Sequence, residues 1–344
     1  MLFNKIILVS DTPKNTGLAY YYTLALKDTI SYSNIILIDN ISLKLNYFIF
    51  FNKYLNFLHN FLNIKAYNIY NSIKTIISSN NEKDVIIFFN NGGLNKKYLN
   101  KIKNFDNLYL INFLSDHPYG LHKKQLKILK QNAHIFDLFI TFSKSINPIL
   151  YRFGANNVYN LPFAYCKYTH FIKDKDLQIL TNNEIHYFGT WTKEIEDMLL
   201  PLQNYNLYIH GSLWRRSNNK ILRTIALSSN DSYYRNMIKS ANNAKIVINF
   251  TRAPHMCLHT MKTFELTIAG ACVISNYSEE QNFYFPDNDS MIYFNTKEEM
   301  VKKINYYLFN NDENFRIRKN ARLKAKENNY HNRSKDLINY LNKL

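Results

Sequence analysis

Short apolar runs alternate with longer helical patterns along nearly all of this 344-residue chain. Strands of four to six apolar residues separated by helices predict βαβ units, and therefore parallel sheets. The helical patterns fall between most of the runs, for example at residues 17–27, 193–202, 232–241 and 297–309. The predicted strands lie at residues 5–10, 34–39, 84–89, 108–113, 138–142, 158–161, 185–188, 207–210, 245–250, 272–275 and 291–294.

So many strands exceed one comfortable doubly wound sheet, and 344 residues are more than one core usually fills. The 46% hydrophobic content is ample for two packed cores. We predict a first domain over residues 1–165 and a polar linker over 166–183. A second domain over 184–328 follows, and a last helix within 329–344 packs back on the first domain.

The balance of 43 basic and 26 acidic residues gives a net charge of +17, which favours an anionic partner. An anionic membrane face, a phosphorylated substrate and nucleic acid all meet this condition. We do not expect nucleic acid as the main partner, because the lysines are scattered and no zinc-finger or RNA-binding aromatic signature is present.

The three cysteines, Cys166, Cys257 and Cys272, are far apart and form neither a zinc spacing nor a disulfide framework. The first residues, MLFNKIILVS, are too short and too quickly polar for a signal peptide. No run of about 18 uncharged apolar residues is present. We therefore expect a cytoplasmic protein.

Residues 259–275, HTMKTFELTIAGACVIS, have the pattern of a helix that ends at a glycine and leads into a buried strand. Helix amino ends bind phosphate, because their first amides lack backbone partners and the helix dipole favours negative charge there. Lys262 lies near this end, and Glu265 lies where it could accept hydrogen bonds from sugar hydroxyls. A nucleotide-sugar site and a plain buried αβ unit both fit this segment alone.

In parallel α/β domains, ligands bind outside the carboxyl ends of the strands. The sequence places polar or glycine-rich loops at these ends in both halves. They are residues 11–17, 90–93, 115–119, 189–194, 211–216 and 251–252. None of them is a Walker loop or a G-x-G-x-x-G fingerprint.

Eight segments, in order along nearly the whole chain, are similar to the CgeB-like (spore maturation protein) glycosyltransferases. This family has the GT-B fold of two facing Rossmann-like domains. The segments are FFNNGG (88–93), SDHP (115–118), FDLFITFSKS (136–145), GANNVYNLPFA (154–164), YFGTWTKEIEDML (187–199), YIHGSLW (208–214), AKIVINFTR (244–252) and KTFELTIAGACVIS (262–275).

The resemblance implies that the second domain binds the nucleotide and the first binds the acceptor. It implies that Lys262, at the family's usual arginine position, contacts the diphosphate, and that Glu265 contacts the ribose. It also matches Gly189 and Thr190 to the loop that faces the donor. Beyond the resemblance, we expect Trp214, Arg252 and Thr263 among the donor-binding residues. Retaining GT-B enzymes with an E-x7-E motif have a second glutamate eight positions before this one, where the present chain has Cys257.

Asp116 and His117 follow a first-domain strand, so either could act as general base on an acceptor hydroxyl or hold the donor sugar. An Asx-type turn before Pro118 is the alternative. Asp11 is a weaker candidate of the same kind. Arg252 could offset the charge of the leaving diphosphate, the role that a metal has in other glycosyltransferases. Trp214 could border the nucleotide base or lie on a solvated loop.

We predict no metal and no cofactor. The D-x-D sequence at 287–289 has the pattern of a turn.

Residues 47–61 place aromatic side chains at helical spacing, which fits either an interfacial membrane helix or, more commonly, a buried amphipathic one. The basic residues between 316 and 326 indicate a solvated helix face.

The leading hypothesis is therefore a metal-independent, hexosyltransferase-like GT-B enzyme. Its donor would be a UDP- or GDP-linked sugar. Its acceptor would be a glycan or a lipid-linked precursor, with peripheral contact to an anionic membrane. The alternatives are a non-catalytic GT-B-like protein that binds a glycan or a partner, and an enzyme that glycosylates nucleic acid.

Overall fold

The computed structural model describes residues 3–10, 17–30, 34–38, 64–77, 82–90, 94–171, 177–228, 233–255 and 257–343. They form two compact units. Unit 1 comprises residues 1–162 and 330–344, and unit 2 comprises residues 163–329. Asp11, the predicted helix at 47–61 and most of the loop at 90–93 lie outside the described residues.

Unit 1 is built on a parallel sheet with the strand order β2-β1-β3-β4-β5-β6. Its strands are β1 (Phe3–Val9), β2 (Ile35–Ile38), β3 (Lys83–Phe89), β4 (Leu108–Leu114), β5 (Leu138–Thr141) and β6 (Val158–Asn160). Almost every residue of β3, β4 and β5 is buried, as expected for strands covered on both faces.

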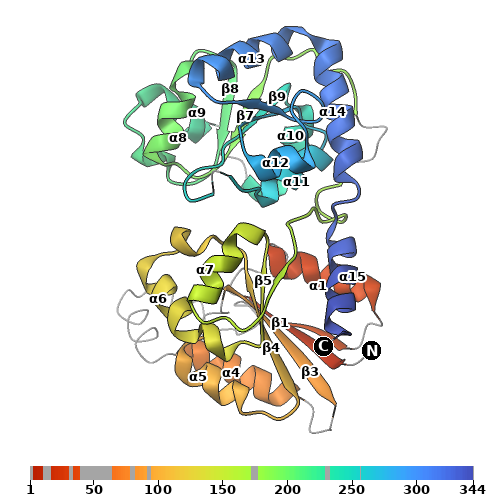
Figure 1. Cartoon of the computed structure of the whole chain (residues 1–344). Coiled ribbons are helices and arrows are strands. Elements are labelled where there is room, and N and C mark those ends of the chain that lie inside the picture. The colour runs from red at the N-terminus through yellow and green to blue at the C-terminus, as the bar shows by residue number, and fades with distance from the viewer. Residues whose placement is uncertain are drawn as a thin grey trace. The chain divides into compact units, whose positions relative to one another are not determined.

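Helices cover both faces of this sheet (Figure 1). The C-terminal helix α15 (Tyr330–Leu341) packs against α1 (Leu18–Thr29), and the Tyr21 and Tyr330 rings stack at 5.7 Å. The predicted return of the last helix to the first domain is therefore confirmed. The remaining helices are α4 (Ile64–Ile76), α5 (Lys96–Lys103), α6 (Lys123–Asn132) and α7 (Asn147–Arg152).

Unit 2 contains a second parallel sheet, with the order β11-β10-β9-β7-β8. Its strands are β7 (Ile185–Phe188), β8 (Leu207–His210), β9 (Ile246–Asn249), β10 (Val273–Asn276) and β11 (Ile292–Phe294). All eleven predicted strands are present, and the predicted α/β architecture with two parallel sheets is confirmed.

The helices of unit 2 form around one hydrophobic core, which includes Ile185, Ile248, Ile274 and Met300. The helices are α8 (Lys193–Leu199), α9 (Lys220–Ser228), α10 (Tyr233–Asn243), α11 (Met261–Ile268), α12 (Glu279–Tyr284), α13 (Lys297–Phe309) and α14 (Asn311–Ala325). The segment expected as a linker, residues 166–183, falls within unit 2 wherever it is described.

Arg318 of α14 fastens the helix α11 from its carboxyl end. Its guanidinium donates to the carbonyl oxygens of Gly270 at 2.6 Å, Gln178 at 2.6 Å and Asn242 at 3.0 Å. Gly270 has φ +80°, the left-handed conformation that commonly ends a helix. These three hydrogen bonds anchor the carboxyl end of α11. They therefore help to set the position of its amino end relative to the sheet.

Candidate functional site

The amino end of α11 lies next to the carboxyl end of β7. The ammonium group of Lys262, in the first turn of α11, donates to the carbonyl oxygen of Phe188, the last residue of β7. Gly189 and Thr190 follow directly. The structure thus brings together Lys262 and the loop that were predicted to contact the donor.

This loop is pressed against the neighbouring loop after β8. The Gly189 N–H donates to the His210 carbonyl oxygen at 2.8 Å. Gly211 has φ +154°, and a Cβ atom there would lie 2.1 Å from the Gly189 carbonyl oxygen. Only glycine at position 211 permits this approach, so the backbone of both loops is tightly constrained.

Two hydroxyl groups bridge the same pair of loops. Thr190 Oγ1 lies 3.1 Å from Ser212 Oγ, and the Trp191 N–H donates to the Ser212 carbonyl oxygen at 2.9 Å. Thr190 is exposed. Residues 189–191 and 211–212 therefore form one polar surface beyond the ends of β7 and β8, exposed at Thr190, which we call the ledge.

Trp214 supports this ledge from inside. Its side chain is only 2% exposed, its indole N–H donates to the Gly189 carbonyl oxygen at 3.0 Å, and its ring meets Tyr187 edge-on. Because Trp214 is buried, the alternative of a solvated loop is wrong, whereas a border to the nucleotide base stays a prediction. The indole belongs to the core and fixes the position of Gly189.

Glu265 lies one turn along α11 from Lys262 and is buried, with 6% exposure. Burial raises the pKa of its carboxyl to about 7, although the nearby Lys262 ammonium acts to lower it. A carboxyl group with this pKa is partly protonated at neutral pH, which is unusual for a group predicted to accept ribose hydrogen bonds.

The buried side chain of His170 lies close to Glu265, with its Nε2 atom 3.7 Å from Glu265 Oε1. Burial lowers the pKa of His170 to about 3, so the imidazole is neutral at physiological pH. His170 Nδ1 accepts a hydrogen bond from the Cys166 N–H at 3.0 Å. The pair is therefore not a charged ion pair at neutral pH.

Gln281 ties α11 to the sheet beneath it. Its Oε1 accepts from Thr263 Oγ1 at 2.9 Å and from Asn249 Nδ2 at 3.1 Å, and its Nε2 donates to Ser275 Oγ at 3.1 Å. Thr263 is fully buried. Its hydroxyl is thus engaged inside the protein and supports the start of α11, and the contact of Thr263 with the donor stays a prediction.

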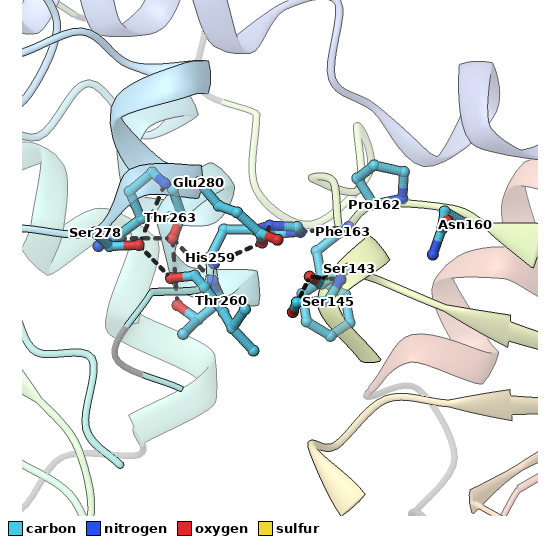
Figure 2. A network of polar contacts seen from close by, with 12 residues as sticks. Ser143, Ser145, Asn160, Pro162, Phe163, His259, Thr260, Thr263, Ser278 and Glu280 are labelled. Carbon is cyan, nitrogen blue, oxygen red and sulfur yellow. Dashed lines mark hydrogen bonds and ion pairs between the residues drawn. The ribbon is translucent and has the colours of Figure 1, made fainter. Parts of the chain in front are cut away.

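His259 and Glu280 form the closest histidine–carboxylate contact next to the start of α11 (Figure 2). His259 Nδ1 lies 2.6 Å from Glu280 Oε2, and His259 Nε2 accepts from the Phe163 N–H at 3.3 Å. His259 is 1% exposed. Since both ring nitrogens are engaged and the ring is buried, this pair is not arranged as a general base.

Arg252 lies on the loop that follows β9 and is exposed. Thr251 beside it is held to β10, because its N–H donates to Asn276 Oδ1 at 2.8 Å. Burial, together with the positive charge of Arg252, lowers the pKa of His255. Cys257 is exposed. β9 lies between β7 and β10 in the sheet, so Arg252 follows a strand next to the one that leads to Gly189.

Asp116 and His117 follow β4 in unit 1. Asp116 is exposed, and its carboxylate accepts from Asn90 Nδ2 at 2.9 Å. His117 is nearly buried, and its Nδ1 accepts from the Tyr119 N–H at 3.2 Å, as the cap of a short 3₁₀ turn. Asp116 thus remains the more accessible of the two, whereas His117 takes part in the turn.

Among the residues that the structure describes, no group of three or more His, Cys, Asp or Glu side chains is placed to hold a metal ion. Asp287 Oδ1 accepts from the Asn288 and Tyr293 amides, both at 3.0 Å, as in a turn. Asp289 pairs with Lys324 at 3.6 Å. In the described part of the chain, no helix is long and apolar enough to cross a membrane.

No short sequence pattern marks His170, Glu280 or Gln281 as part of a site. The i, i+4 spacing of His255 and His259 does not indicate zinc, because no H-E-x-x-H motif surrounds it, and nothing else in the local sequence marks His259. Their contacts join positions far apart in the chain, such as Phe163 and His259, so no short motif contains them.

Comparison with protein families gives a match to the glycosyl transferase-like model over residues 192–339. This range covers most of unit 2 and nearly all of α15. No curated protein sequence matches the chain.

Solved structures match over a wider range. HepE from Anabaena, in complex with UDP-glucose, has a TM-score of 0.66 at 12% identity, over 99% of this chain and 100% of that chain. Sucrose-phosphate synthase from Thermosynechococcus elongatus has a TM-score of 0.64 at 12% identity, over 99% and 88%. TarM from S. aureus, in a complex that contains UDP, has a TM-score of 0.58 at 15% identity, over 80% and 58%.

The chain thus spans 58% of the length of TarM. At these identities the likeness establishes the fold, and the predicted GT-B fold class is confirmed. The family match and the fold together support a glycosyltransferase.

Proposed function

We propose that this chain, with its glycosyl transferase-like second unit, transfers a sugar from a UDP-linked donor to an acceptor hydroxyl. The observation that carries the proposal is the contact of Lys262 with the end of β7, which places a cation and a helix amino end beside the Gly189–Thr190 ledge. Three of the similar solved structures, those of HepE, TarM and the pneumococcal O-GlcNAc transferase GtfA, contain UDP.

In this proposal Lys262 and the first amides of α11 contact the diphosphate. Glu265 accepts hydrogen bonds from the ribose, and Thr190 with the Gly189 backbone faces the donor sugar. Arg252 stabilises the negative charge that develops on the leaving UDP, so that the reaction needs no metal ion. Full activity in the presence of EDTA is the expected result.

We propose unit 1 as the acceptor-binding part, with the Asp116 carboxylate as general base. Asp116 is supported by its exposure and by its place after the carboxyl end of β4. The acceptor would be a glycan or a lipid-linked precursor, and the net charge of +17 favours one that carries negative charge or lies at an anionic membrane. The eight segments similar to CgeB-like enzymes support placement beside that subfamily.

All three cysteines are free thiols, which supports a reducing compartment such as the cytoplasm as the place of action.

The test is to measure UDP binding, and then UDP release from UDP-glucose and UDP-GlcNAc with a panel of glycan and lipid-linked acceptors. Lys262→Ala is the variant that should weaken UDP binding by about tenfold or more. Lys302→Ala, at an exposed lysine on α13, is the matched control. No UDP binding by the wild-type protein would refute the proposal.

UDP binding without turnover on any acceptor would instead favour a non-catalytic glycan-binding protein. Two features favour this second candidate. Lys262 is a point charge at a position where arginine would bind the diphosphate in a bidentate manner. The exposed Cys257 occupies the position at which an E-x7-E enzyme has glutamate.

A further inference from the structure

Two backbone N–H groups of the segment 163–166 determine which nitrogen carries the proton in two buried histidines. The Phe163 N–H donates to His259 Nε2 at 3.3 Å, and the Cys166 N–H donates to His170 Nδ1 at 3.0 Å. A nitrogen that accepts a hydrogen bond carries no proton. The neutral rings therefore hold their protons on Nδ1 in His259 and on Nε2 in His170.

The protonated nitrogen of each ring faces a carboxylate. His259 Nδ1 lies 2.6 Å from Glu280 Oε2, and His170 Nε2 lies 3.7 Å from Glu265 Oε1. Glu280 Oε2 also accepts from the His259 backbone N–H at 3.2 Å. The segment 163–170 is thus linked to α12 through the imidazole of His259 and to α11 through that of His170.

His259 makes the stronger of the two links. Three aromatic rings meet it edge-on, those of Phe163 at 5.6 Å, Phe264 at 5.5 Å and Tyr284 at 5.2 Å. The next residue, Thr260, is the N-cap of α11, and Lys262 follows two positions later. Any shift of His259 therefore moves the residues that we propose to hold the diphosphate.

We infer that His259 is a positioning residue for the donor: its two ring hydrogen bonds, to Phe163 and Glu280, hold the amino end of α11 in the geometry that binds the UDP diphosphate. This inference rests on the proposed function. His259 does not touch the donor. It acts through Thr260 and Lys262, as supporting side chains commonly do at preorganised sites.

Four variants separate the two hydrogen bonds from the packing of the ring. His259→Phe keeps an aromatic ring but removes both bonds. His259→Asn keeps a donor close to the Nδ1 position for Glu280, and His259→Gln keeps an acceptor close to the Nε2 position for Phe163. His186→Phe is the matched control, because His186 is also buried in unit 2 and hydrogen-bonded, to His210 at 3.1 Å.

The measurements are UDP affinity by isothermal titration calorimetry and unfolding of unit 2 by tryptophan fluorescence. We expect His259→Phe to weaken UDP binding at least about tenfold, a loss of about 1.4 kcal/mol, in protein that remains folded. The Asn and Gln variants should be intermediate, and His186→Phe should bind UDP as the wild type does.

The tautomer gives a readout that does not depend on the function. Long-range ¹H–¹⁵N NMR of the wild-type protein should show the proton of His259 on Nδ1, the less common tautomer in neutral histidines. A proton on Nε2 would overturn the inferred hydrogen bonds.

UDP binding by His259→Phe within about twofold of wild type, or an equal loss in His186→Phe, would overturn the positioning role. A wild-type protein that does not bind UDP would overturn the proposed function, and with it this role, whatever the tautomer.

Discussion

Glu265→Gln should stabilise unit 2 in a way that depends on pH. The carboxyl is 6% exposed, and its burial raises its pKa from 4.5 to about 7. Because the pKa in the folded protein is higher than in the unfolded chain, the folded state favours the protonated form. The resulting stability is fully present below pH 4.5 and is lost as the pH rises through 7.

The magnitude follows from the shift. One pKa unit corresponds to 1.36 kcal/mol, so ionisation of Glu265 costs unit 2 about 3 kcal/mol well above pH 7 and less than about 1 kcal/mol at pH 5. Glutamine is nearly isosteric and does not ionise. Its stabilising effect should therefore be about 2 to 3 kcal/mol larger at pH 8.5 than at pH 5. Any cost of burying the amide itself cancels in this difference.

The assay is urea unfolding followed by tryptophan fluorescence. The only two tryptophans, Trp191 and Trp214, both belong to unit 2, so the signal reports on that unit alone. A free-energy difference between variant and wild type that is the same at both pH values would refute the reasoning, since it would mean that Glu265 is ionised throughout this range. Glu194→Gln, at an exposed position on α8, is the control variant.

The other predictions concern the ledge, the diphosphate contact and the general base. Gly211→Ala should prevent unit 2 from folding normally, seen as lost soluble expression or a large drop in urea midpoint, because the added Cβ meets the Gly189 carbonyl oxygen at 2.1 Å. Trp214→Phe should destabilise unit 2 by about 1 to 3 kcal/mol in the same urea assay, because it leaves that buried oxygen without the indole donor. Lys262→Arg should retain UDP binding in calorimetry, whereas Lys262→Ala should weaken it by about tenfold or more, as expected for a charge-assisted contact of roughly 1.5 to 3 kcal/mol. Asp116→Asn should leave UDP affinity unchanged and lower kcat by about 10² to 10⁴.

The strands could be predicted from the sequence because their signal is local. Each run, such as Ile185–Phe188, is short, continuously apolar and followed by a polar loop, and burial on both faces of a parallel sheet requires this pattern. The helix and strand at 259–275 could also be predicted locally, because the glycine that ends α11 and the strand after it are adjacent in the chain.

The supports of the site have no such local signal. The segment 166–183 has the polar, aperiodic sequence of a linker, yet His170 within it is buried and accepts a hydrogen bond from the Cys166 N–H at 3.0 Å. Two exposed arginines, Arg215 and Arg216, follow Trp214 in the chain, and this polar surrounding is compatible with a ligand border or a solvated loop. The 3₁₀ turn Trp214–Arg216 instead directs the indole inward while the arginines remain exposed. Such outcomes depend on which distant backbone groups need partners, and short-range patterns do not contain that information.

The state of Glu265 also connects donor binding to proton release. The His170 imidazole beside it is neutral, and the Lys262 ammonium acts to offset its charge. Ribose hydroxyls that donate to the carboxylate would favour the ionised form and lower its pKa. At pH 7, where about half of the carboxyl groups are protonated, binding of UDP should therefore release about half a proton from Glu265.

Calorimetric titrations of UDP in buffers with different ionisation enthalpies measure this release. UDP itself exchanges protons near this pH, so the quantity that matters is the difference between wild type and Glu265→Gln. A difference of about half a proton at pH 7 that falls towards zero at pH 9 would place the ribose on an ionised Glu265. Equal proton release by both proteins at pH 7 would mean that the nucleotide does not contact this carboxyl group, and the assignment of Glu265 to the ribose would then be wrong even if UDP binds tightly.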